Sequence, residues 1–147
     1  MDPVFARMFY GAVPVQSSPE DMQRWSAALY KIVASDGFSA VERETLRSLG
    51  RLRGTPEELT DAALAGDPRD LSLDELLAGF RDGAPARAML YEVMTIASAD
   101  VYSQRERELV ARAARLLGVD RPTFQTIEAL FEAEVAMRKA RAAVLFP

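Results

Sequence analysis

The stretch DGFSAVERE at residues 36–44 returns as DVYSQRERE at residues 100–108. A shift of 64 positions superposes the Asp, the Ser, the Arg and both Glu residues of the two stretches, and it places Phe38 on Tyr102. The match continues on both sides, with Ile32 on Ile96 and Leu46 on Val110. This repetition predicts two copies of one structural unit.

Each copy contains the pattern of a helix capping box. In such a box the Ser hydroxyl accepts a hydrogen bond from the backbone N–H three residues later, and the Glu carboxylate accepts one from the Ser N–H. Ser39 with Glu42 and Ser103 with Glu106 have this spacing. A Ser cap stabilises a helix by about 0.5–2 kcal/mol relative to Ala. Each copy therefore predicts a helix, a tight acidic turn and a second helix.

Further start signals divide the rest of the chain into helices. They are Ser18-Pro19, Thr55-Pro56, the box formed by Ser72 and Glu75, Pro85 at the start of the second unit, and Asp120 with Pro122. The helix after Ser72 is expected to continue through Phe80 to Gly83, and Gly37 and Gly118 are expected to close helices. The side chains expected to face inward include Trp25, Leu29, Ile32, Leu46, Leu49, Leu52, Met89, Leu90, Val93, Leu109, Val110, Leu116, Leu117, Phe124, Ile127, Leu130, Phe131 and Val135.

No stretch alternates with the period of two that is typical of strands. We therefore predict an all-α fold, a compact bundle of seven to eight helices built on two pseudo-symmetric helical hairpins. A chain of 147 residues fits one domain, 1–147. Its core spans about 18–135, preceded by an N-terminal docking segment, 1–17. Residues 136–147 are the end of the last helix and an apolar tail, which either docks on the N-terminal segment or contacts a second copy or a partner.

Composition excludes several classes of function. The chain has no Cys and no His, which excludes disulfides, thiol nucleophiles, the usual zinc sites and imidazole chemistry. The formal charge of −4 argues against nucleic-acid binding, which needs a concentrated basic face. No run approaches the ~18 apolar residues of a membrane span, and the N-terminus lacks the basic region of a signal peptide. We expect a soluble, cytoplasmic protein.

The acidic turns are the candidate site. If the two hairpins pack symmetrically, six carboxylates could converge, namely Asp36, Glu42, Glu44, Asp100, Glu106 and Glu108. Oxygen ligands suit a divalent cation such as Ca²⁺, Mg²⁺ or Mn²⁺. Against a metal site, the capping boxes would already engage Glu42 and Glu106. Structural capping, metal binding and a partner-facing acidic surface all remain open. Arg43 and Arg107 are interpreted as part of a solvated helix face with local ion pairs.

Catalysis has little support in the sequence. No motif places a base near a suitable Ser, and no Gly-rich loop is present to hold a phosphate. A pair of carboxylates would need a deep pocket and a raised pKa for acid–base work. We therefore expect no enzyme activity.

The repeated motif resembles that of a known family. Ala34-Ser35-Asp36-Gly37 with Glu42, Ala97-Ser98-Ala99-Asp100 with Glu106, and Leu116-Leu117-Gly118-Val119 are similar to the TerB-like domain. That domain occurs in tellurite-resistance proteins and at the N-terminus of some membrane-anchored DnaJ-like co-chaperones. The resemblance covers about residues 18–135. The second copy departs from it, because Val101 stands where Gly is usual, and a β-branched residue avoids positive φ.

The resemblance implies a role without catalysis. It suggests an interaction or sensing module of a bacterial stress response of the tellurite-resistance type, with protein partners that include membrane-associated ones. A homodimer through the apolar terminal segments is a further expectation. The alternative is a divalent-metal-binding protein that uses the duplicated acidic turns. We expect no other cofactor and no nucleic-acid partner.

Overall fold

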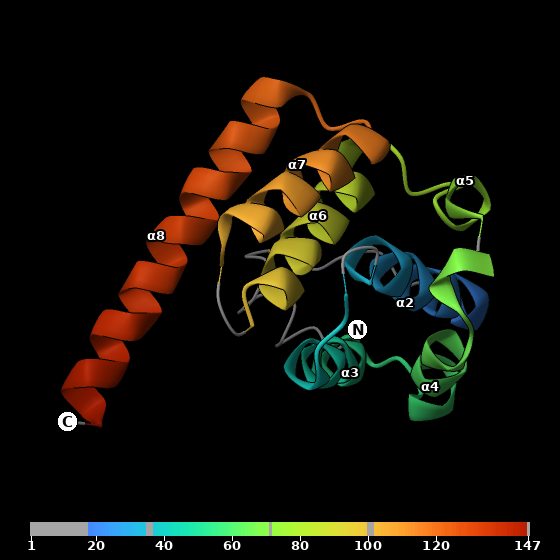
Figure 1. The fold of residues 1–147 in the computed structure, drawn as a ribbon, viewed down its shortest axis with the longest axis horizontal. Coiled ribbons are helices and arrows are strands. Elements are labelled where there is room, and N and C mark those ends of the chain that lie inside the picture. Colours follow the sequence, from blue (N-terminus) through green and yellow to red (C-terminus); the bar gives the residue numbers. More distant parts are fainter. Residues whose placement is uncertain (1–17, 35–36, 71, 100–101, 147) are drawn as a thin grey trace.

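The computed structural model describes residues 18–34, 37–70, 72–99 and 102–146. These ranges contain seven α-helices and one short 3₁₀-helix, which confirms the all-α prediction (Figure 1). The elements are α2 (Pro19–Val33), α3 (Ala40–Arg53), α4 (Glu57–Ala65), η1 (Pro68–Asp70), α5 (Leu73–Leu76), α6 (Gly83–Ala97), α7 (Gln104–Leu116) and α8 (Arg121–Leu145). The expected docking segment, 1–17, lies outside the described residues.

Two helical hairpins, α2–α3 and α6–α7, form the centre of the domain. Helix α6 contacts α2, α3, α7 and α8, while α4 and α5 cover α2 from the other side (Figure 1). The fully buried side chains lie mainly on α2 and α6, the first helix of each hairpin, and on the parts of the other helices that contact α2 and α6. The largest apolar ones are Leu29, Val33, Leu46, Leu77, Met89, Leu90, Val93, Met94, Ile96, Leu117 and Phe131. Helix α6 is therefore the central element of the core.

One polar cluster is buried inside this apolar core. The Glu92 side chain on α6 is fully buried, and Arg53 at the end of α3 is 7% exposed. Arg53 donates a hydrogen bond through Nη1 to Glu92 Oε2 and one of 3.2 Å through Nη2 to Ser26 Oγ. Trp25 Nε1 donates to the same Glu92 oxygen at 3.0 Å. The cluster thus links α2, α3 and α6.

The same shift of 64 residues shows that this cluster is not duplicated. The counterpart of Glu92 in the first hairpin is Ala28, and the counterpart of Arg53 in the second is Leu117. Both counterparts are fully buried. The ion pair between α3 and α6 therefore corresponds to two buried apolar residues, Leu117 and Ala28, at the repeated positions.

Two predicted helix starts are wrong in detail. Thr55 does not cap α4, whose N-cap is Pro56 without a side-chain hydrogen bond. The Thr55 N–H donates instead to Gly50 O at 2.9 Å, so Thr55 belongs to the end of α3, where Gly54 takes a left-handed conformation. Helix α6 begins at Gly83, which leaves Pro85 in the first turn, where proline is tolerated.

The helix expected after Ser72 is shorter than predicted. The Ser72 hydroxyl accepts from the Glu75 N–H at 3.4 Å, but α5 ends at Leu76 rather than near Gly83. Gly79 has a φ of 85°, which turns the chain out of the helix. Leu77 and Phe80 are nevertheless buried. Their apolar side chains therefore indicate burial in the core and not a continuation of the helix.

Two residues expected in the core are exposed. Leu52 is 43% exposed, because the buried stripe of α3 runs through Leu49 and Arg53 instead. Leu130 is 59% exposed and lies one residue, about 100° of helix rotation, from buried Phe131. Leu116, also expected in the core, is only half-buried. Gly118 was expected to close a helix, and its φ of 71° directly after the C-cap Leu117 of α7 confirms this prediction.

The last helix extends beyond the body of the domain. Helix α8 begins at the N-cap Asp120, as predicted, and continues to Leu145. Every residue from Ala136 to Phe146 is exposed, with Val144 at 79% and Phe146 at 81%. This apolar end therefore does not pack on the described part of the domain. No helix in the described ranges is long and apolar enough to cross a membrane.

Candidate functional site

Both capping boxes are formed as the repeated motif predicts. The Glu42 N–H donates to Ser39 Oγ at 3.1 Å, and the Ser39 N–H donates to Glu42 Oε2 at 2.7 Å. In the second box the Glu106 N–H donates to Ser103 Oγ at 3.4 Å, and the Ser103 N–H donates to Glu106 Oε2 at 2.9 Å. The boxes fix the direction in which α3 and α7 leave the two turns.

The aromatic residue before each cap has the same neighbour in both units. The Arg43 guanidinium lies over the Phe38 ring at 5.1 Å from its centroid, and that of Arg107 lies over the Tyr102 ring at 4.6 Å. A cation over an aromatic face gains about 0.5–1 kcal/mol at an exposed site. The interpretation of both arginines as part of a solvated helix face with local ion pairs did not include these ring contacts.

Each aromatic residue also has a partner of its own. Phe38 packs on Tyr30, with ring centroids 5.0 Å apart, whereas Tyr102 packs on Phe131 of α8 at 6.1 Å. Arg107 donates to Glu132 Oε1 of α8 at 2.6 Å, an ion pair that is distant in sequence. The second turn thus attaches α8 to the domain, a contact that the repeat alone did not reveal.

Residues of both repeated stretches line one surface hollow of about 250 Å³, here called the turn hollow. Glu42 and Glu106, the acids of the two boxes, both line it, and Arg105 supplies a positive charge among them. The full lining is Val33, Gly37, Phe38, Ser39, Glu42, Arg105, Glu106 and Leu109. Of the six predicted carboxylates, Glu42 and Glu106 therefore line the same hollow.

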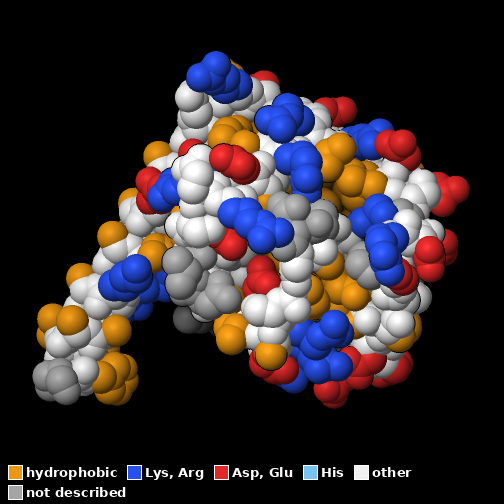
Figure 2. Space-filling view, viewed as in Figure 1, with side chains coloured by type: hydrophobic (Ala, Val, Ile, Leu, Met, Phe, Trp, Pro, Cys, Tyr) orange, Lys and Arg blue, Asp and Glu red, His pale blue; other side chains and the backbone are white. Residues whose placement is uncertain are grey.

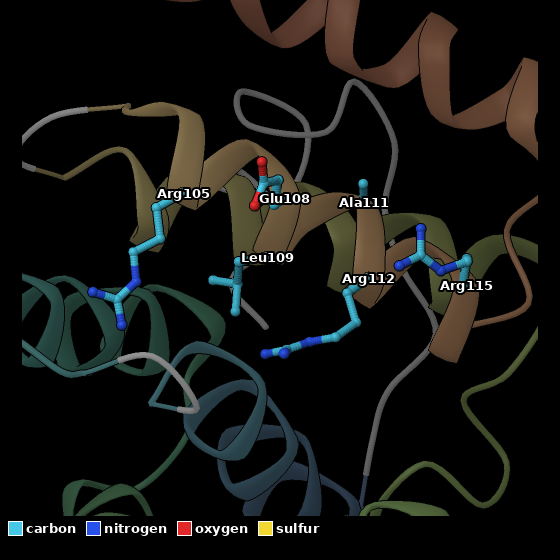
Figure 3. A pocket seen from close by; sticks show the side chains of 6 residues that line it. All are labelled: Arg105, Glu108, Leu109, Ala111, Arg112 and Arg115. Atoms are coloured by element: carbon cyan, nitrogen blue, oxygen red, sulfur yellow. The ribbon is translucent and has the colours of Figure 1, made fainter.

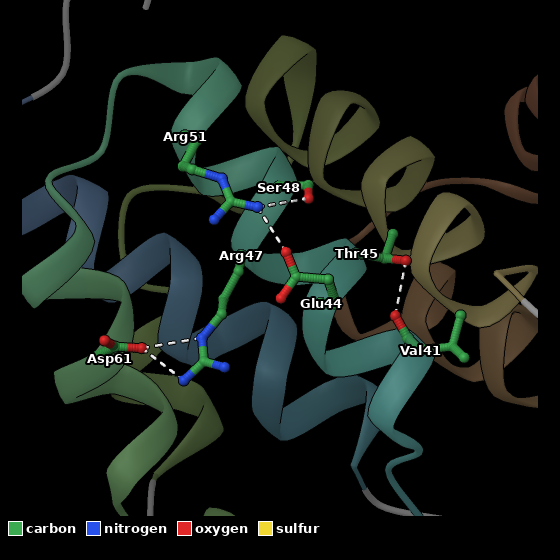
Figure 4. Close-up of polar contacts among 7 residues, drawn as sticks. All are labelled: Val41, Glu44, Thr45, Arg47, Ser48, Arg51 and Asp61. Atoms are coloured by element: carbon green, nitrogen blue, oxygen red, sulfur yellow. Dashed lines mark hydrogen bonds and ion pairs between the residues drawn. The ribbon is translucent and has the colours of Figure 1, made fainter.

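The other predicted ligands are placed differently. Asp36 and Asp100 lie outside the described residues. Glu44 accepts a hydrogen bond from Arg51 Nη2 at 2.6 Å on the outer face of α3, where Arg47 also binds Asp61 (Figure 4). Glu108 accepts from Gln104 Nε2 at 3.1 Å. Within the described ranges no group of three or more acidic residues could hold a metal ion.

A second hollow, of about 590 Å³, lies along α7 and is here called the arginine hollow. Arg105, Arg112 and Arg115 extend along it, with Glu108, Leu109 and Ala111 completing its lining (Figure 3). The sequence gives a signal for this surface, because residues spaced by seven and three share one helix face. Arg105 lines both hollows and so connects the turn hollow to the arginine hollow.

The fold and the sequence of this chain were compared with those of known proteins. No protein-family model and no curated protein matches the chain. The arrangement is a duplicated all-α hairpin domain with an additional long helix, and it matches a solved structure. That structure is a tellurite resistance protein from Nostoc punctiforme, which aligns with a TM-score of 0.79 over 99% of this chain and 91% of the other, at 20% identity. The chain therefore has the TerB-like fold that the repeated motif indicated.

Tyr102 gives the second turn a measurable pH dependence. Its hydroxyl is buried and has no hydrogen-bond partner among the described residues. Burial, followed by the negative charge of Glu128, raises the pKa of Tyr102 to about 12. An unfolded Tyr ionises near pH 10. Between about pH 10 and pH 12 the unfolded state therefore releases a proton that the folded state retains, and the domain loses stability as the pH rises.

We predict that Tyr102→Phe is at least as stable as the wild type at pH 7, because it removes an unpaired buried hydroxyl that costs about 1–3 kcal/mol. Between pH 10 and 12 the variant should lose less of its free energy of unfolding than the wild type. Urea unfolding at pH 7, 10 and 11 measures both effects. The control is Tyr91→Phe, which removes a hydrogen bond that Tyr91 donates to Glu134 and should destabilise at pH 7. A Tyr102→Phe variant that is weaker at pH 7 and equally alkali-sensitive would contradict this interpretation.

Proposed function

We propose that this chain is a non-catalytic interaction module of a TerB-like stress-response system of the tellurite-resistance type. The observation that carries the proposal is that residues of both repeated stretches line one hollow that opens to the surface. The fold neighbour is itself a tellurite resistance protein, which supports the assignment to this type of system. Cytoplasmic location and protein partners, membrane-associated ones among them, belong to the same proposal.

The turn hollow has the character of a contact surface. The first turns of α3 and α7 form part of its walls. Capping boxes fix both of these turns, so this part of the surface is pre-organised and needs little ordering on binding. Glu42, Glu106 and Arg105 place both signs of charge beside the aromatic ring of Phe38. Paired charges around an aromatic anchor are features of specific protein interfaces.

Site-specific photo-crosslinking tests the interaction. A photoreactive residue replaces Arg105 at the rim of the turn hollow, and a control version carries it at Arg87, an exposed position near the start of α6. In the native cell we expect a discrete crosslinked protein from position 105 and none from position 87. Equal crosslinking from both positions, or none from 105, would reject the turn hollow as the interaction surface.

Divalent-metal binding is the second proposal, because Glu42 and Glu106 line the same hollow. Each uses Oε2 to accept the Ser N–H, which leaves Oε1 available as an oxygen ligand. Asp36 and Asp100, three residues before each capping Ser, would complete the set. The hard oxygen ligands would suit Ca²⁺, Mg²⁺ or Mn²⁺. The guanidinium of Arg105 in the same hollow opposes this role.

Calorimetry with Ca²⁺, Mg²⁺ and Mn²⁺ decides whether a metal binds. If it does, the wild type releases or absorbs heat, and free metal at one hundred times the Kd stabilises the fold by about 2.7 kcal/mol. The Asp36→Asn/Asp100→Asn variant should lose both effects. The Glu44→Gln/Glu108→Gln variant should keep them, since these two acids do not line the turn hollow. Absence of heat and of any shift in Tm for the wild type would end the metal hypothesis.

A further inference from the structure

Helix α8 is longer than the surface on which it packs. Its first half contacts the core through Phe124, Ile127, Phe131 and Val135. Every residue from Ala136 to Phe146 is exposed, and Figure 1 shows this part of α8 extending past α6 and α7. A helical segment of about ten residues is marginal in water when nothing packs against it. Within the described ranges, the projecting half of α8 therefore lacks the tertiary contacts that usually stabilise such a helix.

The exposed side of α8 carries a regular apolar stripe. Leu130, Met137 and Val144 recur at intervals of seven residues and are 59%, 59% and 79% exposed. Ala133 and Ala140 fall three residues after the first two, so apolar residues occupy the first and fourth places of a heptad. This is the pattern of a two-stranded coiled coil. These five residues are here called the α8 stripe, and Figure 2 shows hydrophobic side chains along the projecting helix.

The α8 stripe is distinct from the face that packs on the core. Leu130 lies one residue before buried Phe131, which is about 100° around the helix. The two faces of α8 thus have separate roles. One attaches the helix to α6 and α7, while the other remains open to solvent along almost the whole helix.

The charges on α8 identify what fits this stripe. Glu134 is the acid that borders the stripe, and Arg141 is the base one heptad further on. Glu128 and Glu132 instead pair with Arg107 of the same chain. In an antiparallel pair of α8 helices, Glu134 of one copy lies toward Arg141 of the other, whereas a parallel pair would place each of them beside its like. Charge complementarity therefore favours an antiparallel second copy.

Glu134 and Arg141 border the α8 stripe on one side, one heptad apart. An antiparallel pair centred near Met137 would place Glu134 of each copy beside Arg141 of the other. Glu134 accepts a hydrogen bond from Tyr91 of its own chain through Oε2, which restrains the carboxylate and leaves Oε1 for this contact. The two-fold axis repeats the pair, so one dimer contains two such contacts.

We propose that the protein forms an antiparallel homodimer through the α8 stripe, with paired contacts between Glu134 of one copy and Arg141 of the other. The projecting half of each α8 then packs beside the first half of its mate, and Leu130 lies near the partner's Val144. This specifies the partner and the geometry of the dimer expected through the apolar end of the chain. The stripe is separate from the turn hollow, so the test of one surface is independent of the other.

Multi-angle light scattering coupled to size exclusion gives the first test. The wild-type chain should have twice its mass of 16.2 kDa, and Met137→Glu should have the mass of a monomer. The matched control is Ala142→Glu, which adds the same charge on the side of α8 away from the stripe and should remain dimeric. Circular dichroism checks that each variant keeps its fold. A monomeric wild type, or a dimer that survives Met137→Glu, overturns the proposal.

A charge-swap experiment tests the antiparallel geometry. Glu134→Arg alone places Arg against Arg141 of the mate, and Arg141→Glu alone places Glu against Glu134, so each variant should shift toward monomer. Mixed in equal amounts, the two variants form a heterodimer in which both contacts are again between opposite charges, and the dimer mass returns. Lys139→Glu, the control for the change of charge, should not weaken the dimer. Singles that fail to recover on mixing, although the wild type is dimeric, contradict the antiparallel arrangement.

Discussion

The arrangement of the two hairpins depends on the buried contact between Arg53 and Glu92. Removing both charges from water costs several kcal/mol for each ion, and the contact is tolerated only because its remaining hydrogen-bond capacity is used. Trp25 and Ser26 supply those bonds from α2, so three helices must be in register for the charges to be satisfied. An alternative docking of α3 on α6 would leave a buried charge unpaired. The cluster thus selects one packing among many that would bury the same apolar area.

The duplication is retained where interactions are local and lost where they are distant. Both units keep the capping box and the arginine over the aromatic ring, contacts made within five residues. The helices that cover each unit differ, because α4 packs on the first and α8 on the second. Both capping-box glutamates therefore line one hollow, while the outer surfaces are free to diverge. The capping boxes and the arginine–aromatic contacts are thus shared by both units, whereas the surfaces made by α4 and α8 differ between them.

The difference between local and distant contacts also explains which parts of the fold could be predicted from the sequence. Helix starts with a Ser or Asp cap were found because a cap is decided within four residues, and the two turns were found because they repeat. Thr55 misled because its backbone N–H was needed at the end of α3, and Leu52 and Leu130 misled because only tertiary packing selects the buried face. Glu92 gave no local signal at all. Its pairing joins residues 39 positions apart, which only the folded structure reveals.

A double-mutant cycle on Arg53→Met and Glu92→Leu tests the central claim most directly, with Trp25, the only Trp, as the fluorescent reporter of unfolding. Each single variant leaves a buried charge without its partner and should lose about 3–5 kcal/mol of stability. The double variant removes both charges and should be more stable than either single variant, so the two effects are strongly non-additive. If the costs of the single variants simply add in the double variant, the Arg53–Glu92 contact does not determine how the hairpins pack.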